Sequence, residues 1–124
     1  MIVLGVDYGR RRIGLALASE GIIETKGAIE YRKLSQALEE IQGLIIREKV
    51  ELVVVGRSSG AMGLEIDEFV RRLKKMIKLP VELVDETLTS WEAERRVGWR
   101  DKSRVNSVAA ALILERYLDR IQSS

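Results

Sequence analysis

Two apolar segments of this chain end in acidic residues, and a run of arginines follows the first of them. The segment IVLGVD closes at Asp7, and the segment VELVDE closes at Asp85 and Glu86. A carboxylate at the end of a buried strand is costly to desolvate unless a cation lies against it. A metal ion, an arginine or a phosphate-bound magnesium ion would each compensate. The acids and their neighbours therefore indicate metal or phosphate chemistry.

The residue types that the chain lacks narrow that chemistry. Its 124 residues include no cysteine and no histidine. This excludes disulfides, thiolate nucleophiles, Cys/His zinc sites and any mechanism with a histidine base. Catalysis would have to use carboxylates, hydroxyls, lysines, arginines and a hard metal held by oxygen ligands.

Length and composition predict one globular domain over residues 1–124. Hydrophobic residues make up 46% of the chain, which is enough for a real core. No apolar run approaches the roughly 20 residues of a membrane span, and the N-terminus lacks the pattern of a signal peptide. We expect a cytoplasmic protein without a membrane partner.

The net charge is only +2, but basic residues gather in two segments. The first contains Arg71, Arg72, Lys74, Lys75 and Lys78, and a solvated helix face explains it as well as a binding surface does. The second runs from 95 to 104, where Trp99 stands among cations. A loop of this composition gains little from packing, so we predict that it contacts a polyanion.

Apolar periodicity predicts the elements that position these residues. Continuous or alternating apolar runs predict strands at 2–7, 12–19, 22–30, 51–56 and 81–86. Helical spacing predicts helices from Leu34 to Ile45, from Ile66 to Met76 and over about 105–121. A further helix is expected over 89–97, because Thr89 and Glu92 match a capping box. The triplet Ala109–Ala111 would let the last helix lie close against the sheet.

This element order predicts an α/β fold with a mixed five-stranded sheet of order 3-2-1-4-5 and helices on both faces. It is the order of the ribonuclease H-like fold. The first strand would be central and parallel to the fourth, so Asp7 and the pair Asp85–Glu86 would open on the same edge. Such a cluster beside arginines predicts a Mg²⁺ or Mn²⁺ site acting on phosphate. Alternatively, each acid forms a turn or pairs with an arginine.

Three segments together resemble the signature blocks of a known family. They are GVDYGRRRIGLA, VDETLTSWEAE and VNSVAAALIL, in the expected order and spacing over essentially the whole chain. They resemble the YqgF family, Holliday-junction-resolvase-like bacterial proteins to which nuclease action on the 5′ end of pre-16S ribosomal RNA is ascribed. The resemblance implies a ribonuclease H-like fold and metal-dependent phosphodiester hydrolysis.

The resemblance also implies roles for individual residues. Asp7 matches the family's first acid and Glu86 its second, so both would hold the metal, and Asn106 would complete the catalytic set through its amide oxygen. Arg11 and Arg57 would hold the flanking phosphates, and Trp99 could stack on an unpaired base or pack on its own helix. The nucleic-acid-binding residues expected in all are Arg10, Arg11, Arg57, Trp99, Arg100, Lys102 and Arg104.

The chain departs from the family pattern at three places. Asn106 stands where the third block usually opens with aspartate, and Thr87 stands where the second block has arginine. After the fourth strand, GRSSGAMG replaces the usual Gly-Leu-Pro. A neutral amide binds divalent cations less firmly than a carboxylate does. Asn106 has a second interpretation, as the N-cap of the last helix. Asp85 and Asp101 remain open as further ligands.

Other functions remain open at this stage. The departures allow a nucleic-acid-binding protein that has lost its chemistry. The same cleft would suit a DNA-junction nuclease, although RNA is the favoured substrate. The first block also resembles the phosphate loop of actin-like ATPases and sugar kinases, but those enzymes close two such domains around a nucleotide. A monomer and a homodimer both fit the sequence.

Overall fold

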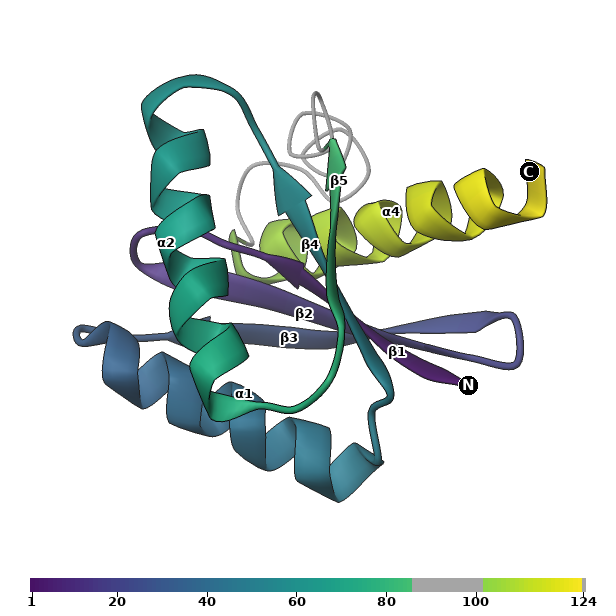
Figure 1. The fold of residues 1–124 in the computed structure, drawn as a ribbon, viewed down its shortest axis with the longest axis horizontal. Helices are drawn as coiled ribbons and strands as arrows, with labels where there is room; N and C mark the ends of the chain where they lie inside the picture. Colours follow the sequence, from purple (N-terminus) through teal and green to yellow (C-terminus); the bar gives the residue numbers. More distant parts are fainter. Residues whose placement is uncertain (86–101, 124) are drawn as a thin grey trace.

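The computed structural model describes residues 1–85 and 102–123, and its elements follow the expected order (Figure 1). The strands are β1 (Ile2–Asp7), β2 (Arg12–Ser19), β3 (Ile22–Glu30), β4 (Leu52–Arg57) and β5 (Val81–Asp85). The helices are α1 (Leu34–Glu48), α2 (Gly60–Met76) and α4 (Lys102–Ser123). The helix expected over 89–97 lies outside the described residues, as do Glu86, Trp99, Arg100 and Asp101.

The sheet has the predicted order, β3-β2-β1-β4-β5. β1 pairs antiparallel with β2 and parallel with β4, β2 pairs antiparallel with β3, and β4 pairs parallel with β5. β1 is therefore central, and the carboxyl ends of β1, β4 and β5 lie at one edge of the sheet. Because β2 and β3 are antiparallel, the start of β2 and the end of β3 lie at that edge too.

The two faces of the sheet carry separate hydrophobic cores, as expected of a sheet covered by helices on both sides. Leu4 and Val6 of β1 belong to the cluster formed with α1 and α2, whereas Val3 belongs to the cluster formed with α4. Side chains alternate between the faces of a strand, so this assignment extends along β1. Figure 1 shows α1 and α4 on opposite sides of the strands.

Helix α4 lies so close to the sheet that two strand positions admit only glycine. A Cβ on Gly5 would come within 2.6 Å of Leu114 Cγ and 2.8 Å of the Ala110 carbonyl oxygen. A Cβ on Gly14 would come within 2.0 Å of the Asn106 carbonyl oxygen. Ala109 and Ala110 are fully buried, as the alanine triplet predicted.

Several boundaries differ from those expected. β4 covers Leu52–Arg57 rather than 51–56, and α2 begins at Gly60, ahead of Ile66. Leu64 is exposed in the first turns of α2, so these turns lack the regular spacing of buried apolar residues that marks the rest of the helix. α4 begins at Lys102 rather than near 105. Among the described residues, no helix is long and apolar enough to cross a membrane.

Candidate active site

Asp7 is the last residue of β1, and its side chain is buried in the middle of the sheet. It is 6% exposed, and among the described residues no other charged side chain is buried to this degree. Asp7 is buried because it continues the apolar strand β1, which lies between β2 and β4 in the sheet. Alternation along β1 directs Asp7, like Val3, to the face that α4 covers. The predicted acid therefore lies at a central strand end, where open α/β sheets bind ligands.

Asn106 lies beside the strand position opposite Asp7. The register of β1 and β2 pairs Asp7 with Gly14. The backbone of Asn106 packs against Gly14 so closely that the space a Cβ on Gly14 would need is already occupied. The absence of a side chain at Gly14 thus lets α4 bring Asn106 onto the Asp7 face. The fold brings together two of the three residues predicted to be catalytic.

The interpretation of Asn106 as a helix cap is wrong. Helix α4 begins at Lys102, a full turn before Asn106. Asn106 is therefore an interior helical residue, where asparagine is intrinsically less favourable than alanine.

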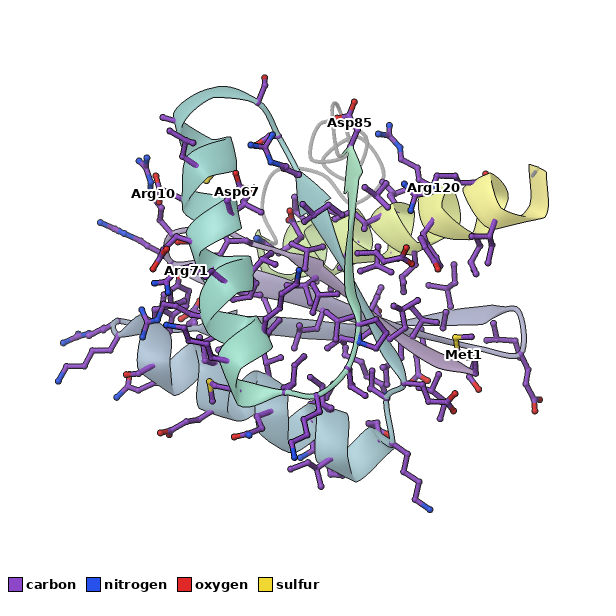
Figure 2. The ribbon with its side chains drawn as sticks, in the orientation of Figure 1. Met1, Arg10, Asp67, Arg71, Asp85 and Arg120 are labelled. Carbon is purple, nitrogen blue, oxygen red and sulfur yellow. The ribbon has the colours of Figure 1, made fainter. Side chains whose placement is uncertain are left out.

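Asp85 ends β5 at the same edge but on the other face of the sheet. Val84 packs in the α4 cluster, so alternation directs Asp85 to the α2 face, opposite to Asp7. There it borders a groove of about 290 Å³ together with Arg57, Ser58 and Ser59. Figure 2 shows Asp85 at the tip of β5. Within the described residues no three acidic side chains form a metal-binding group.

The end of β5 is held from the side by α4. The Arg116 guanidinium donates a 2.9 Å hydrogen bond to the main-chain oxygen of Asp85, and Arg120 donates one of 3.4 Å to that of Leu83. The pairing with β4 turns these two carbonyls outward, to the open edge of the sheet. The two arginines therefore satisfy edge carbonyls that would otherwise be exposed.

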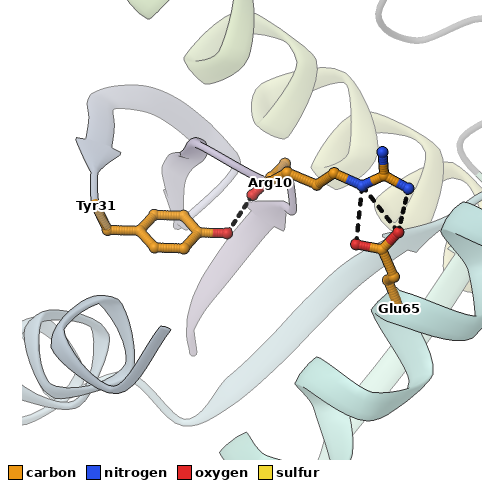
Figure 3. A network of polar contacts seen from close by, with 4 residues as sticks. Arg10, Tyr31 and Glu65 are labelled. Atoms are coloured by element: carbon orange, nitrogen blue, oxygen red, sulfur yellow. Dashed lines mark hydrogen bonds and ion pairs between the residues drawn. The ribbon is translucent and has the colours of Figure 1, made fainter. Parts of the chain in front are cut away.

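Arg10, one of the predicted phosphate contacts, is engaged by a carboxylate of α2. Its Nε donates to both carboxylate oxygens of Glu65, at 3.0 and 2.9 Å, and its terminal nitrogen completes a two-pronged ion pair (Figure 3). This hydrogen bonding holds the pKa of Glu65 below its ordinary value. The carboxylate thus stays ionised near neutral pH and offsets the charge of Arg10.

Arg57 is held in the same way at the end of β4. It binds Asp67 of α2 through two hydrogen bonds of 2.8 and 2.9 Å, which lower the pKa of Asp67. Nothing in the sequence pointed to Glu65 and Asp67, because acids two apart on a helix do not share a face. Figure 2 shows Asp67 on α2 and Arg10 beside that helix.

The remaining predicted cations fall into two groups. Arg11 is exposed, and its side chain has no hydrogen bond or ion pair within residues 1–85 and 102–123. Lys102 and Arg104 lie in the first turn of α4, and their side chains are outside the described part. In the first basic segment, Arg71 pairs with Glu68 across one turn of α2, as expected of a solvated helix face.

A profile of the RuvX family, described as Holliday junction resolvase, matches residues 1–120. The chain belongs to this family. RuvX is the YqgF family that the three sequence blocks resemble, so that identification is confirmed.

Similar proteins carry a consistent name. A protein of Synechococcus elongatus is 38% identical over 130 residues, covering 94% of this chain and 87% of the relative, and one of Trichormus variabilis is 35% identical, covering 94% and 86%. Both are named "Putative pre-16S rRNA nuclease".

A solved structure supports the fold. RuvC of T. thermophilus in complex with a Holliday junction substrate superposes with a TM-score of 0.65. The match covers 97% of this chain and 96% of that one, at 14% identity. This similarity shows that the chain has the ribonuclease H-like fold expected from its element order.

Proposed function

We propose that this RuvX-family chain is a nuclease that hydrolyses phosphodiester bonds with the help of a divalent metal, and that its substrate is the 5′ end of pre-16S rRNA. The proposal depends on one arrangement. Buried Asp7 pairs with Gly14 in the sheet, and the backbone of Asn106 packs against Gly14, so Asp7 and Asn106 lie near the same strand position. The names of the relatives supply the substrate. Such a substrate would place the protein in the cytoplasm.

The residues on the Asp7 face suit a hard cation. Asp7 offers a carboxylate and Asn106 an amide oxygen, the donor types that Mg²⁺ and Mn²⁺ prefer. Glu86 would be the second carboxylate ligand. When bound, the ion supplies positive charge at the scissile phosphate and an activated water for in-line attack. With Asn106 in place of an acid, the site has one charge fewer, so we expect weak metal binding and slow cleavage.

Cations along the same edge would hold the phosphates that flank the scissile bond. Arg11 is available for this without rearrangement, whereas Arg10 and Arg57 would have to exchange a carboxylate of α2 for a phosphate. Trp99 would stack on an unpaired base. Arg100, Lys102 and Arg104 would add contacts from the basic segment.

Cleavage assays over a range of Mg²⁺ and Mn²⁺ concentrations test the proposal. The substrates are structured and single-stranded RNA and DNA, and the proteins are the wild type, Asp7→Asn and Glu51→Gln. Glu51 is an exposed acid immediately before β4, at the opposite edge of the sheet, and controls for the change of charge. We expect cleavage that requires the ion, disappears in Asp7→Asn and persists in Glu51→Gln.

The folding of Asp7→Asn separates catalysis from stability. Without metal, this variant should be as stable as the wild type or more so, because a buried carboxylate is removed. Near wild-type cleavage by Asp7→Asn would place the site elsewhere. Binding that depends on salt but never leads to cleavage would identify a protein that binds nucleic acid and has lost the chemistry.

A DNA junction is the second candidate substrate, favoured by the description of the family as Holliday junction resolvase. Its phosphates would meet the same edge of the sheet. The assay distinguishes the two, because preferential cleavage of a four-way junction over pre-16S rRNA fragments would favour the DNA substrate.

A further inference from the structure

A second feature of the Asp7 edge is a broad groove on the side of β2 and β3. It has a volume of about 800 Å³ and is lined by four arginines, which are Arg10, Arg11, Arg12 and Arg32. Arg10 and Arg11 lie in the turn between β1 and β2, Arg12 is the first residue of β2, and Arg32 follows the end of β3. Because Arg12 pairs with Glu30 in the β2–β3 register, both segments lie at the sheet edge where β1 ends. The groove therefore begins next to the strand that carries Asp7.

Two hydrogen bonds fix the walls of the groove to one another. The backbone N–H of Tyr31 donates to the Arg11 carbonyl at 3.2 Å, and the Tyr31 hydroxyl donates to the Gly9 carbonyl at 2.5 Å (Figure 3). Burial raises the pKa of Tyr31 above its ordinary value, so the hydroxyl keeps its proton throughout the neutral range. The turn after β1 and the loop after β3 are thus joined before any ligand arrives, which lowers the entropic cost of binding.

The four arginines differ in how far their charge is already compensated. Arg10 is paired with Glu65, and Arg12 is paired with Glu30 at 2.9 Å. Arg11 and Arg32 are exposed, and their guanidinium groups make no hydrogen bond or ion pair within the described ranges 1–85 and 102–123. Two guanidinium groups from different segments therefore remain to bind an anion from outside. Guanidinium binds phosphate through two parallel hydrogen bonds.

We propose that this groove binds the phosphodiester backbone of the substrate strand on one side of the scissile bond, with Arg11 and Arg32 each contacting a phosphate. The inference rests on the proposed function, because it takes the Asp7 edge as the place of cleavage. It adds the path of the strand, which runs from β1 across the ends of β2 and β3, away from α2. It also assigns Arg32, which the sequence did not single out.

The test compares the salt dependence of binding in two double variants. Arg11→Ala/Arg32→Ala removes the two groove cations. Arg47→Ala/Lys78→Ala removes two exposed cations at the opposite edge of the sheet, one in the last turn of α1 and one just beyond the end of α2. Both variants lower the net charge equally. Binding of a single-stranded RNA oligonucleotide is measured in EDTA, where cleavage is suppressed, over a range of NaCl concentrations.

The groove predicts a smaller salt dependence for the first variant only. Each lost phosphate contact reduces the slope of log K against log salt by about 0.7 for a single strand, so the groove variant should lose about 1.4. The control should keep the wild-type slope.

The outcomes separate this inference from the proposed function. Equal slopes for the two double variants would overturn the groove even if the wild type cleaves RNA. A wild type that shows no cleavage with Mg²⁺ or Mn²⁺ would overturn the nuclease, while the slopes measured in EDTA would still report on the groove.

Discussion

The two faces of the sheet are packed in opposite ways. Towards α1 and α2 the strands present large side chains such as Leu4 and Ile13, which fill a thick apolar layer. Towards α4 they present Gly5, Gly14 and Ala16, and the helix backbone comes to the strands directly. The first arrangement contributes buried apolar area. The second contributes less area per residue but places a backbone segment, and with it Asn106, against Gly14, the strand partner of Asp7.

The comparison predicts that adding a methyl group on the α4 face costs more stability than removing one from the α1/α2 face. Gly14→Ala is expected to have the largest effect. Its methyl group would collide with the Asn106 carbonyl, a backbone atom that cannot rotate away, so α4 must shift. We expect a loss of about 3 kcal/mol or more in the free energy of unfolding, at or above the upper end of typical overpacking costs. Urea denaturation measures it.

Gly43→Ala controls for the substitution itself. Gly43 is exposed within α1, and a Cβ there meets no atom within 4 Å. This variant should gain up to about 1 kcal/mol, since alanine is the better helix former. If Gly14→Ala proved as stable as the wild type, the close approach of α4 to β2 would be wrong.

Asn106→Asp sharpens the comparison by placing a second carboxylate on the Asp7 face. With a metal site there, the Mg²⁺ concentration for half-maximal cleavage should fall roughly tenfold, which corresponds to about 1.4 kcal/mol. Cleavage should also become faster. Unchanged metal dependence would show that Asn106 does not face the ion.

The same variant should respond to pH when no metal is present. Two adjacent carboxylates raise one another's pKa in the folded state. When the pKa of an acid is higher in the folded state than in the unfolded state, the free energy of unfolding decreases as rising pH ionises that acid. The metal-free variant should therefore match the wild type in acid, fall below it near neutral pH and recover when Mg²⁺ is added.

Ile66→Val tests the opposite face with the removal of a single methyl group. Ile66 of α2 is fully buried in the thick core. Removing the methyl group should cost about 0.5–1.5 kcal/mol, less than adding one at Gly14, and the metal dependence of cleavage should not change. A cost above that of Gly14→Ala would reverse the contrast between the two faces.

Glu65→Gln/Asp67→Asn should have the smallest effect. Removing the two carboxylates of α2 frees Arg10 and Arg57 for phosphates, so nucleic acid should bind several-fold more tightly at low salt and with a steeper salt slope. Glu68→Gln, which frees Arg71 elsewhere on α2 and changes the net charge by half as much, shows whether freeing any arginine of this helix is enough. Weaker binding by the double variant would mean that the carboxylates position the arginines rather than compete for them.

These pairs should persist at neutral pH. Hydrogen bonds from the arginines lower the pKa of Glu65 and Asp67 in the folded protein. The stability that these ion pairs contribute is therefore lost only when pH falls through those lowered values. The tighter binding of the double variant should therefore be seen throughout the neutral range and shrink in acid. Titration of binding against pH checks this.

Most of the fold could be predicted because it depends on local periodicity. Alternating and continuous apolar runs marked the strands, helical spacing marked the helices, and their order fixed the sheet topology. The start of α2 could not be found in this way, because its first turns expose Leu64 and leave no period. The start of α4 at Lys102 was missed by one turn, which is why Asn106 was open to interpretation as a cap.

By itself, the sequence determined that Asp7 ends a buried strand and that Gly14 lies near the start of the next one. It also determined that the chain belongs to a family of nuclease-like proteins. Only the tertiary structure decided which acids share a face, because alternation along β5 places Asp85 opposite to Asp7 once Val84 is known to pack on α4. It also decided which arginines are already paired. Ion pairs such as Arg10–Glu65 join distant segments, and no local pattern encodes the packing that brings those segments together.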